Sequence, residues 1–164
     1  MKREVYRTPK AGSINDLKRQ VEELSAPQPD EVTVKVHAIG LNFADIFAIQ
    51  GLYSATPKGS FIPGLEYSGE IIEVGKDVQE WKKGDRVMGA TKFGGYVTHI
   101  NSHHRYVTAL PESWSYEEGA GFLVQGLTAY YGLTKLGNLQ KGMNVLMTWA
   151  TSAPAGPWMS SWSG

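Results

Sequence analysis

The feature that most constrains the fold is a series of short β-rich segments separated by glycine and proline. In residues 31–38 (EVTVKVHA), apolar side chains occupy every second position, and this period places them on one face of a strand. Further segments of this kind lie at residues 67–74, 85–89, 95–100 and 105–110. Many short strands with glycine turns favour a β-barrel or a sandwich over a helical bundle.

Two segments have the periodicity of helices instead. Residues 42–50 (NFADIFAIQ) predict a helix that ends at Gly51 and has its apolar side chains near one face. These side chains are Phe43, Ile46, Phe47 and Ile49. A longer helix is predicted from Ser115 to about residue 136, because Ser115 and Glu118 fit a capping box. We expect this second helix to pack tightly, since it is rich in glycine and alanine.

Composition excludes several classes of protein. The 164 residues include 16 basic and 16 acidic side chains with no run of like charge, so no basic surface for nucleic acid is expected. There is no cysteine, which rules out disulfides, thiolate nucleophiles and cysteine-ligated zinc. The N-terminus lacks the apolar region of a secretory signal, and no apolar run is long enough to span a membrane. We therefore expect a cytoplasmic protein.

Five sequence motifs follow one another along the chain. They are PGLEYSGEIIEVG, KKGDRVMG, FGGYVTHI, LPESWSYEEGAGFLVQGLTAYYGL and LQKGMNVL. Their order and spacing resemble those of the medium-chain dehydrogenase/reductase superfamily, over roughly residues 15–147. The resemblance implies a mainly β (α+β) fold, in which a GroES-like, partly open β-barrel is followed by the truncated start of a Rossmann-type α/β domain.

The resemblance also implies a division of the chain. Residues 1–122 would form the GroES-like substrate (catalytic) domain, and residues 123–147 the first helix and first strand of an incomplete NAD(P)-binding domain. After that strand, at residues 144–148, relatives place a glycine-rich turn that binds the cofactor pyrophosphate. Residues 150–155 (ATSAPA) contain no glycine, and residues 148–164 form an atypical tail. We interpret the chain as the N-terminal part of such an enzyme.

Zinc-binding members of this superfamily have a cysteine before the first helix and a His-Glu pair in a PGHE turn. In this sequence the turn is PGLE, with Leu65 in place of the histidine and Glu66 as a single potential ligand. Zinc needs three or four converging ligands, and the histidines lack metal-site spacing, so we expect no metal. The segment GLNFADIFAIQGLYS instead resembles the zinc-free quinone oxidoreductase branch, which includes zeta-crystallin and the vesicle amine transport protein-like members. Enoyl reductase domains of polyketide synthases share much of this pattern.

This resemblance implies four site residues. Asn42 would be both catalytic and cofactor-binding, because it would lie near the nicotinamide and donate from its amide to the developing oxyanion of the substrate carbonyl. Tyr53 would be a second catalytic candidate and would line the substrate pocket with Phe47, while Thr128 would contact the cofactor. Two alternatives stay open: Asn42 caps the following helix, and Tyr53 is a loop aromatic that covers the barrel mouth. Asp45 is expected to accept hydrogen bonds from nearby backbone groups rather than act as a base.

The family implies an NADPH- or NADH-dependent, zinc-independent oxidoreductase in its full-length form, and we expect this N-terminal fragment alone to be inactive. The full-length enzyme would reduce quinones or α,β-unsaturated carbonyl compounds by hydride transfer, with the protein supplying orientation and electrostatics. The alternative is a non-catalytic GroES-like module that binds a ligand or a partner. We also expect a homo-oligomer, because an incomplete second domain would expose strand edges and apolar helix surface.

Overall fold

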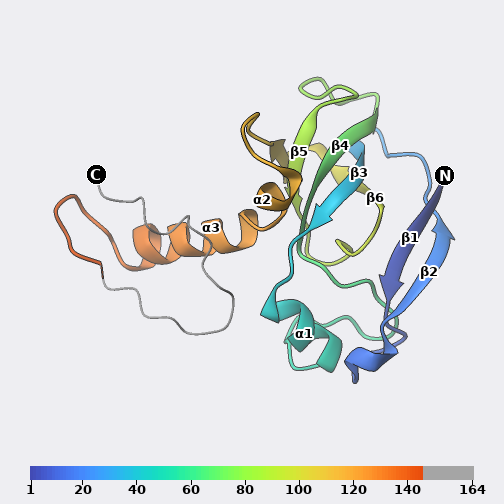
Figure 1. The fold of residues 1–164 in the computed structure, drawn as a ribbon, viewed down its shortest axis with the longest axis horizontal. Helices are drawn as coiled ribbons and strands as arrows, with labels where there is room; N and C mark the ends of the chain where they lie inside the picture. Colours follow the sequence, from blue (N-terminus) through green and yellow to red (C-terminus); the bar gives the residue numbers. More distant parts are fainter. Residues whose placement is uncertain (146–164) are drawn as a thin grey trace.

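The structure is a computed structural model and describes residues 1–145. Its centre is a sheet of five antiparallel strands in the order β6–β3–β4–β5–β7 (Figure 1). These strands are β3 (Glu31–Ile39), β4 (Glu66–Val74), β5 (Arg86–Ala90), β6 (His99–His103) and β7 (Val107–Ala109). The mainly β, GroES-like fold that the sequence indicates is thereby confirmed.

A separate hairpin packs beside this sheet (Figure 1). It consists of β1 (Lys2–Arg7) and β2 (Lys18–Glu23), with a 3-10 turn, η1 (Ile14–Asp16), between them. Val5 is the only buried residue of β1, and it forms an isolated antiparallel bridge with Val97. The sequence patterns above do not identify this hairpin, because charged residues surround its single buried valine and hide the period of a half-buried strand.

The predicted strands differ from the observed ones in informative ways. Residues 31–38, 67–74 and 85–89 agree with β3, β4 and β5 to within a residue. The segment predicted at residues 95–100 is shifted, because Val97 bridges β1 before β6 begins at His99. Part of the segment predicted at residues 105–110 forms a second 3-10 turn, η2 (His104–Tyr106), which leaves only the short β7.

The main hydrophobic core lies between the central sheet and the segments that cross it. Val32 and Val34 of β3 are fully buried, as their alternation predicts. On the opposite face Thr33 is buried too, and its hydroxyl hydrogen-bonds to Asn101 Oδ1 at 2.8 Å. The other buried members of this core are Val5, Ile62, Tyr67, Ile71, Val78, Val87, Val97, Ile100 and Val107.

The extent of the first predicted helix is confirmed. Helix α1 (Phe43–Gln50) has Asn42 at its N-cap and ends at Gly51, whose φ of 79° is in the left-handed region. The side chains it buries are those of Asp45, Ala48 and Ile49, whereas Phe43, Ile46 and Phe47 face outward. Of the four apolar side chains predicted near one face, only that of Ile49 is buried, and it shares the buried side of α1 with Asp45, which accepts from Asn42 N and the Tyr96 hydroxyl.

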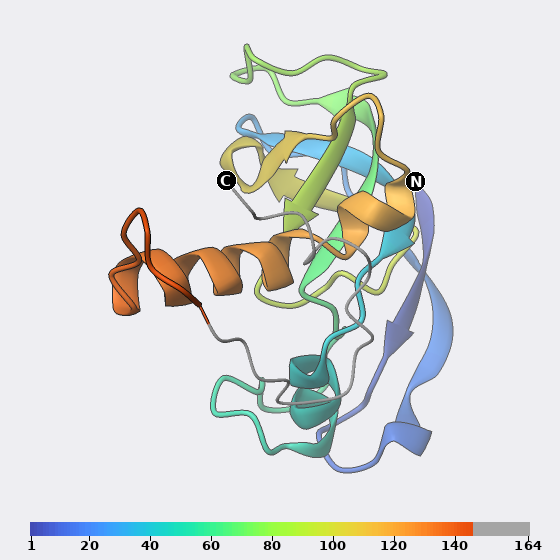
Figure 2. The same cartoon turned by 60° about the vertical axis from the view of Figure 1, so that its left-hand side comes forward.

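The long helix predicted from Ser115 is divided. Its capping box is confirmed, with Ser115 N donating to Glu118 Oε2 at 2.7 Å and Glu118 N to Ser115 Oγ at 3.2 Å. Helix α2 (Tyr116–Ala120) then ends at Gly121, and α3 (Leu123–Tyr130) begins anew and continues as the π-helical turn η3 (Tyr131–Leu136). Both views show α3 projecting away from the sheet (Figures 1 and 2).

The tight packing expected of the long helix holds for α2 and not for α3. Gly119 of α2 is buried so closely that a Cβ there would lie 2.3 Å from Leu110 Cδ1. On α3, by contrast, only Leu123 is buried, and Leu127 and Tyr130 are exposed. The two halves of the predicted helix therefore have different surroundings, and only the first belongs to the packed barrel.

Other predictions depend on the C-terminal residues. Of the strand predicted at residues 144–148, only Asn144 and Val145 are described, and they are not in a strand. The predicted tail, residues 148–164, lies outside the described residues. The division into domains stays a prediction. None of the helices within residues 1–145 has the length and apolar character that a membrane span requires.

Replacing Ile71 of β4 with alanine is expected to lower the free energy of unfolding by about 2–5 kcal/mol, because a fully buried side chain would leave a cavity. The matched control is Val21→Ala on β2, where the side chain is exposed and a change within about 0.5 kcal/mol is expected. Urea denaturation followed by tryptophan fluorescence measures both. Equal losses in the two variants would contradict the assignment of the core.

Candidate functional site

Asn42 lies in the turn that connects β3 to α1. Its backbone N–H donates to Asp45 Oδ2 at 2.9 Å, and its carbonyl oxygen accepts from Asp45 N at 3.0 Å, so its backbone occupies the N-cap position. Its side-chain nitrogen, Nδ2, donates to Glu66 Oε1 at 2.9 Å. The capping box also uses the Asn42 side chain, which accepts from the Asp45 backbone, so capping and the contact with Glu66 coexist in one residue.

Glu66 is the buried partner of that amide. It is only 1% exposed, and its second oxygen, Oε2, accepts from Val124 N at 2.8 Å, in the first turn of α3. Burial raises the pKa of Glu66 above its ordinary value, although the hydrogen bonds from Val124 and Asn42 act against this rise. One carboxylate thus connects β4, the Asn42 turn and α3.

Gly40 makes room for this arrangement. A Cβ atom at residue 40 would lie 2.4 Å from both Glu66 Cγ and the carbonyl oxygen of Ala120. Such contacts are shorter than real Cβ atoms tolerate, so the backbone between β3 and α1 can approach Glu66 only if glycine stands here. Gly40 is therefore required for packing against Glu66, in addition to being part of the Gly-Leu-Asn segment that resembles the family.

Asp45 forms a second buried carboxylate beside the first. It is 2% exposed, and its Oδ2 accepts from the Tyr96 hydroxyl at 3.1 Å in addition to Asn42 N. Burial raises the pKa of Asp45, and burial together with the Asp45 charge raises the pKa of Tyr96. Since Asp45 accepts a backbone hydrogen bond at the start of α1, its expected role is confirmed.

Phe47 and Tyr53 lie on exposed surface at α1 and in the loop that follows it. Phe47 is 45% exposed, and its ring lies 6.2 Å from that of Phe43, centroid to centroid. Tyr53 is 39% exposed, and its carbonyl oxygen accepts from Thr56 N at 2.9 Å and from the Thr56 hydroxyl at 2.6 Å. The two residues therefore contribute to an open aromatic surface, which fits the alternative of a loop aromatic for Tyr53 as well as a substrate contact.

Thr128 is exposed on α3, one helical turn after Val124. Residues four apart lie on the same side of a helix, so Thr128 shares a side with the residue that Glu66 holds. Glu66 therefore connects the elements that carry Asn42 and Thr128, whereas Phe47 and Tyr53 belong to α1 and its loop.

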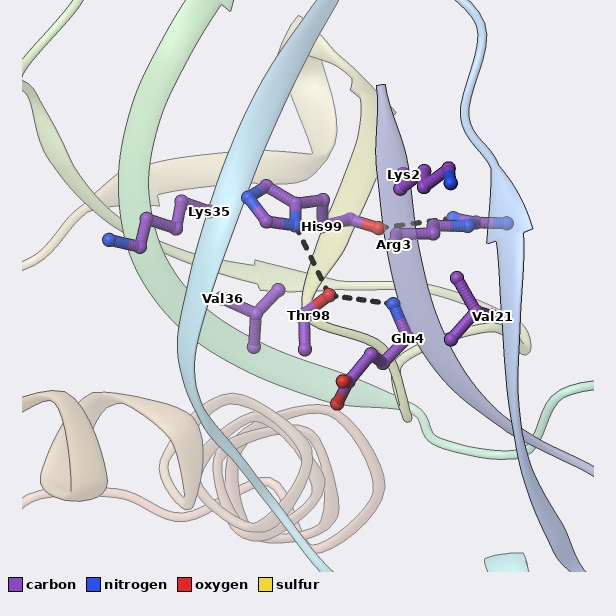
Figure 3. A pocket seen from close by; sticks show the side chains of 8 residues that line it. All are labelled: Lys2, Arg3, Glu4, Val21, Lys35, Val36, Thr98 and His99. Atoms are coloured by element: carbon purple, nitrogen blue, oxygen red, sulfur yellow. Dashed lines mark hydrogen bonds between the residues drawn. The ribbon is translucent and has the colours of Figure 1, made fainter.

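Two cavities of the described chain are lined by residues other than the predicted site residues. The larger one, of about 510 Å³, opens between the β1–β2 hairpin and the central sheet (Figure 3). Its lining residues are Lys2, Arg3, Glu4, Val21, Lys35, Val36, Thr98 and His99. The smaller one, of about 340 Å³, lies beside Trp81 and Arg86. Neither of these two cavities is lined by a predicted site residue.

Among the described residues, no three His, Asp or Glu side chains lie together in a way that could hold a metal ion. His103 and His104 stack on each other and are paired with Asp30 and Glu80 respectively. The histidine pair thus has carboxylate partners of its own in a surface turn.

Sequence reasoning considered Glu66 only as an isolated metal ligand and missed its connecting role. A signal was present, because a charged residue between Gly64 and the apolar run of β4 is unusual in a buried strand. The partners of that charge could not be identified from the sequence, since Asn42 and Val124 lie 24 and 58 residues away.

Replacing Asp45 with asparagine is expected to change how stability depends on pH. Because the pKa of Asp45 is raised from its ordinary value of 3.8, its contribution to stability is fully present below that value and is lost as pH rises through the folded-state pKa. Asparagine has no such loss, so Asp45→Asn should gain stability relative to the wild type as pH rises from about 4 towards 7.

Urea denaturation at a series of pH values measures this difference in the free energy of unfolding. The control is Asp77→Asn, at an exposed position, for which the difference from the wild type should not grow with pH in this way. A constant difference for Asp45→Asn across the range would contradict the raised pKa.

Comparisons with known proteins agree with this fold. The family model described as the alcohol dehydrogenase GroES-like domain matches residues 28–155. The human synaptic vesicle membrane protein VAT-1 homolog is 41% identical over 122 residues, which are 74% of this chain and 31% of the relative. Quinone oxidoreductase-like protein 2 of Bos taurus is 39% identical over 148 residues, which are 88% of this chain and 42% of the relative.

Solved structures show the same similarity in three dimensions. The human VAT-1 homolog-like protein has a TM-score of 0.83 at 31% identity, over 87% of this chain and 46% of that one. Escherichia coli quinone oxidoreductase complexed with NADPH has a TM-score of 0.76 at 31% identity, over 83% and 41%. CurK enoyl reductase has a TM-score of 0.75 at 31% identity, over 84% and 44%.

The chain spans less than half the length of these relatives. The family model nevertheless matches most of this chain, and the strand order and the PGLE turn lie within the matched residues. The chain therefore belongs to the alcohol dehydrogenase GroES-like domain family, and its relatives and structural neighbours include quinone oxidoreductases and quinone oxidoreductase-like proteins.

Proposed function

We propose that this chain supplies the substrate-side barrel of an NAD(P)H-dependent, zinc-independent oxidoreductase that reduces quinones or α,β-unsaturated carbonyl compounds. The observation that carries the proposal is the position of the Asn42 amide. Glu66 holds this amide at the N-terminal end of α1, the helix that carries the exposed side chains of Phe43 and Phe47. Relatives described as quinone oxidoreductase and enoyl reductase support the reaction class. A neighbour complexed with NADPH supports NADPH as the cofactor.

The described residues fit a nicotinamide cofactor on chemical grounds. Asn42 uses one amide hydrogen of Nδ2 for Glu66, which leaves the second hydrogen of that group as a donor. The hydroxyl of Thr128 is exposed on the side of α3 that Glu66 holds. We propose that Asn42 and Thr128 contact the cofactor, which when bound supplies the hydride.

The remaining steps belong to this chain's own side chains. The free N–H of Asn42 donates to the substrate carbonyl oxygen as negative charge develops there, and this stabilises the transition state. Phe47 and Tyr53 bind the flat apolar ring of the substrate and exclude water from it. Water supplies the proton that completes the reduction, and Asp45 takes no part in proton transfer, because its carboxylate is buried and accepts hydrogen bonds from Asn42 and Tyr96.

Zinc independence rests on the turn that precedes β4. Leu65 stands beside Glu66 and has no atom that can bind a metal ion. Glu66 itself is committed to Asn42 and Val124, so both its oxygens already have donors. We therefore propose polarisation of the carbonyl by Asn42 in place of a metal ion.

The domain division belongs to the same proposal. Residues 1–122 are the substrate domain, and residues 123–147 begin the cofactor domain. The outward-facing apolar side chains of α1 and α3 would then face the cofactor domain or a second copy of the chain, and we propose a cytoplasmic location. The competing function is a non-catalytic module that binds a ligand through this same surface.

Titration with NADPH and NADH, followed by tryptophan fluorescence, tests the proposal. If this chain itself uses the cofactor, we expect saturable binding at micromolar concentration and oxidation of NADPH when a quinone or an enone is added. A zinc chelator should not inhibit this oxidation. A folded chain that binds neither cofactor at millimolar concentration would contradict cofactor use by this chain and favour the non-catalytic module. Inhibition by the chelator would contradict zinc independence.

Replacing Asn42 with alanine is expected to reduce kcat by about 100-fold, because one donor to the developing oxyanion is lost. The control is Gln50→Ala at the exposed C-terminal end of the same helix, for which no change in kcat is expected. Steady-state rates with a quinone measure both variants. Equal rates for Asn42→Ala and the wild type would remove Asn42 from the reaction.

A further inference from the structure

We propose that Glu66 is a positioning residue, which sets the orientation of the Asn42 amide and couples it to the first turn of α3. The catalytic consequence of this inference rests on the function proposed above, whereas the orientation itself does not. Nothing in the family resemblance assigns Glu66 a role in the absence of zinc, and the inference comes from its hydrogen bonds alone.

The first step concerns the two ends of an amide. The Asn42 side chain has a nitrogen that only donates and an oxygen that only accepts, and rotation by half a turn would exchange them. An ionised carboxylate accepts only, so Glu66 Oε1, at 2.9 Å, selects the orientation in which Nδ2 faces it. In the opposite orientation Asn42 Oδ1 would face a carboxylate oxygen, and the two would repel each other.

The second step concerns the burial of the carboxylate. Glu66 is 1% exposed, and Gly40 approaches it so closely that a Cβ at residue 40 would lie 2.4 Å from Glu66 Cγ. The carboxylate is therefore fixed by packing as well as by its donors. A rigid acceptor gives a fixed amide, which an oxyanion donor needs in order to act without reorganisation.

The third step concerns α3. The same carboxylate accepts from Val124 N at 2.8 Å, so the start of α3 and the Asn42 turn share one acceptor group. Thr128 lies one turn further along α3 and is exposed on the same side. A ligand that contacts both Asn42 and Thr128 would consequently meet two groups whose relative position depends on Glu66.

Nuclear magnetic resonance of the full chain tests the orientation without reference to activity. The wild type should show through-hydrogen-bond couplings from the Asn42 side-chain nitrogen and from the Val124 backbone nitrogen to the Glu66 carboxyl carbon. Absence of the Asn42 coupling in the folded wild type would overturn the proposal. This arm needs no variant, so it decides the question even where a substitution at Glu66 prevents folding.

The matched variants are Glu66→Gln and Glu73→Gln, on the same strand. Glutamine keeps the size of Glu66 but replaces one acceptor oxygen with a donor, so either Asn42 Nδ2 or Val124 N loses the acceptor that it has in the wild type. Exchange of the Asn42 side-chain or Val124 backbone amide hydrogens should become about tenfold faster in Glu66→Gln, as expected for one lost hydrogen bond. It should not change in Glu73→Gln, because Glu73 is exposed. Unchanged exchange in Glu66→Gln would contradict the proposal.

A double-mutant cycle separates positioning from a general effect on stability. If Glu66 acts through Asn42, Glu66→Gln should lower kcat more than it changes KM, and it should add no further loss of kcat to Asn42→Ala. Additive losses would overturn the coupling. If the chain binds no cofactor, the proposed function fails for this chain, and the resonance measurements still decide the orientation of Asn42.

Discussion

The buried carboxylate of Glu66 lies where β4, the Asn42 turn and α3 meet. Each of its oxygens accepts one hydrogen bond, from Asn42 Nδ2 and from Val124 N, and both donors come from distant parts of the chain. A buried carboxylate without donors would be strongly unfavourable, so the positions of these elements depend on one another. Gly40 is a direct consequence, because no larger residue fits against the Glu66 side chain.

The nearby carboxylate of Asp45 makes a negative charge on Glu66 less favourable. The pKa of Glu66 is raised first by burial and further by the charge of Asp45, and the pKa of Asp45 is raised by burial. Two buried carboxylates so close together favour proton uptake, and donors that include Asn42, Val124 and Tyr96 oppose it. Groups held at such a cost to stability are common at functional sites, where position matters more than stability.

The aromatic surface beside this centre follows from the same interaction. Because Asp45 turns inward to meet Asn42 and Tyr96, the opposite side of α1 faces outward with Phe43 and Phe47. Exposure of such apolar side chains to water is unfavourable, and large exposed apolar surfaces normally mark sites of binding. The chain spans less than half the length of the relatives that it matches.

The sequence by itself determined the strands β3, β4 and β5, the extent of α1 and the capping box at Ser115. These features depend on residues that are close together in the chain, such as the alternation in residues 31–38 and the Ser115–Glu118 pair. The family resemblance identified Asn42, Tyr53, Phe47 and Thr128, but it gave no indication of how they are held. Only the tertiary structure decided which face of α1 is buried, where the long helix breaks and which group orients Asn42. The physical reason is that hydrogen-bond partners of a buried charge are set by packing between distant segments, and no local period in the sequence records them.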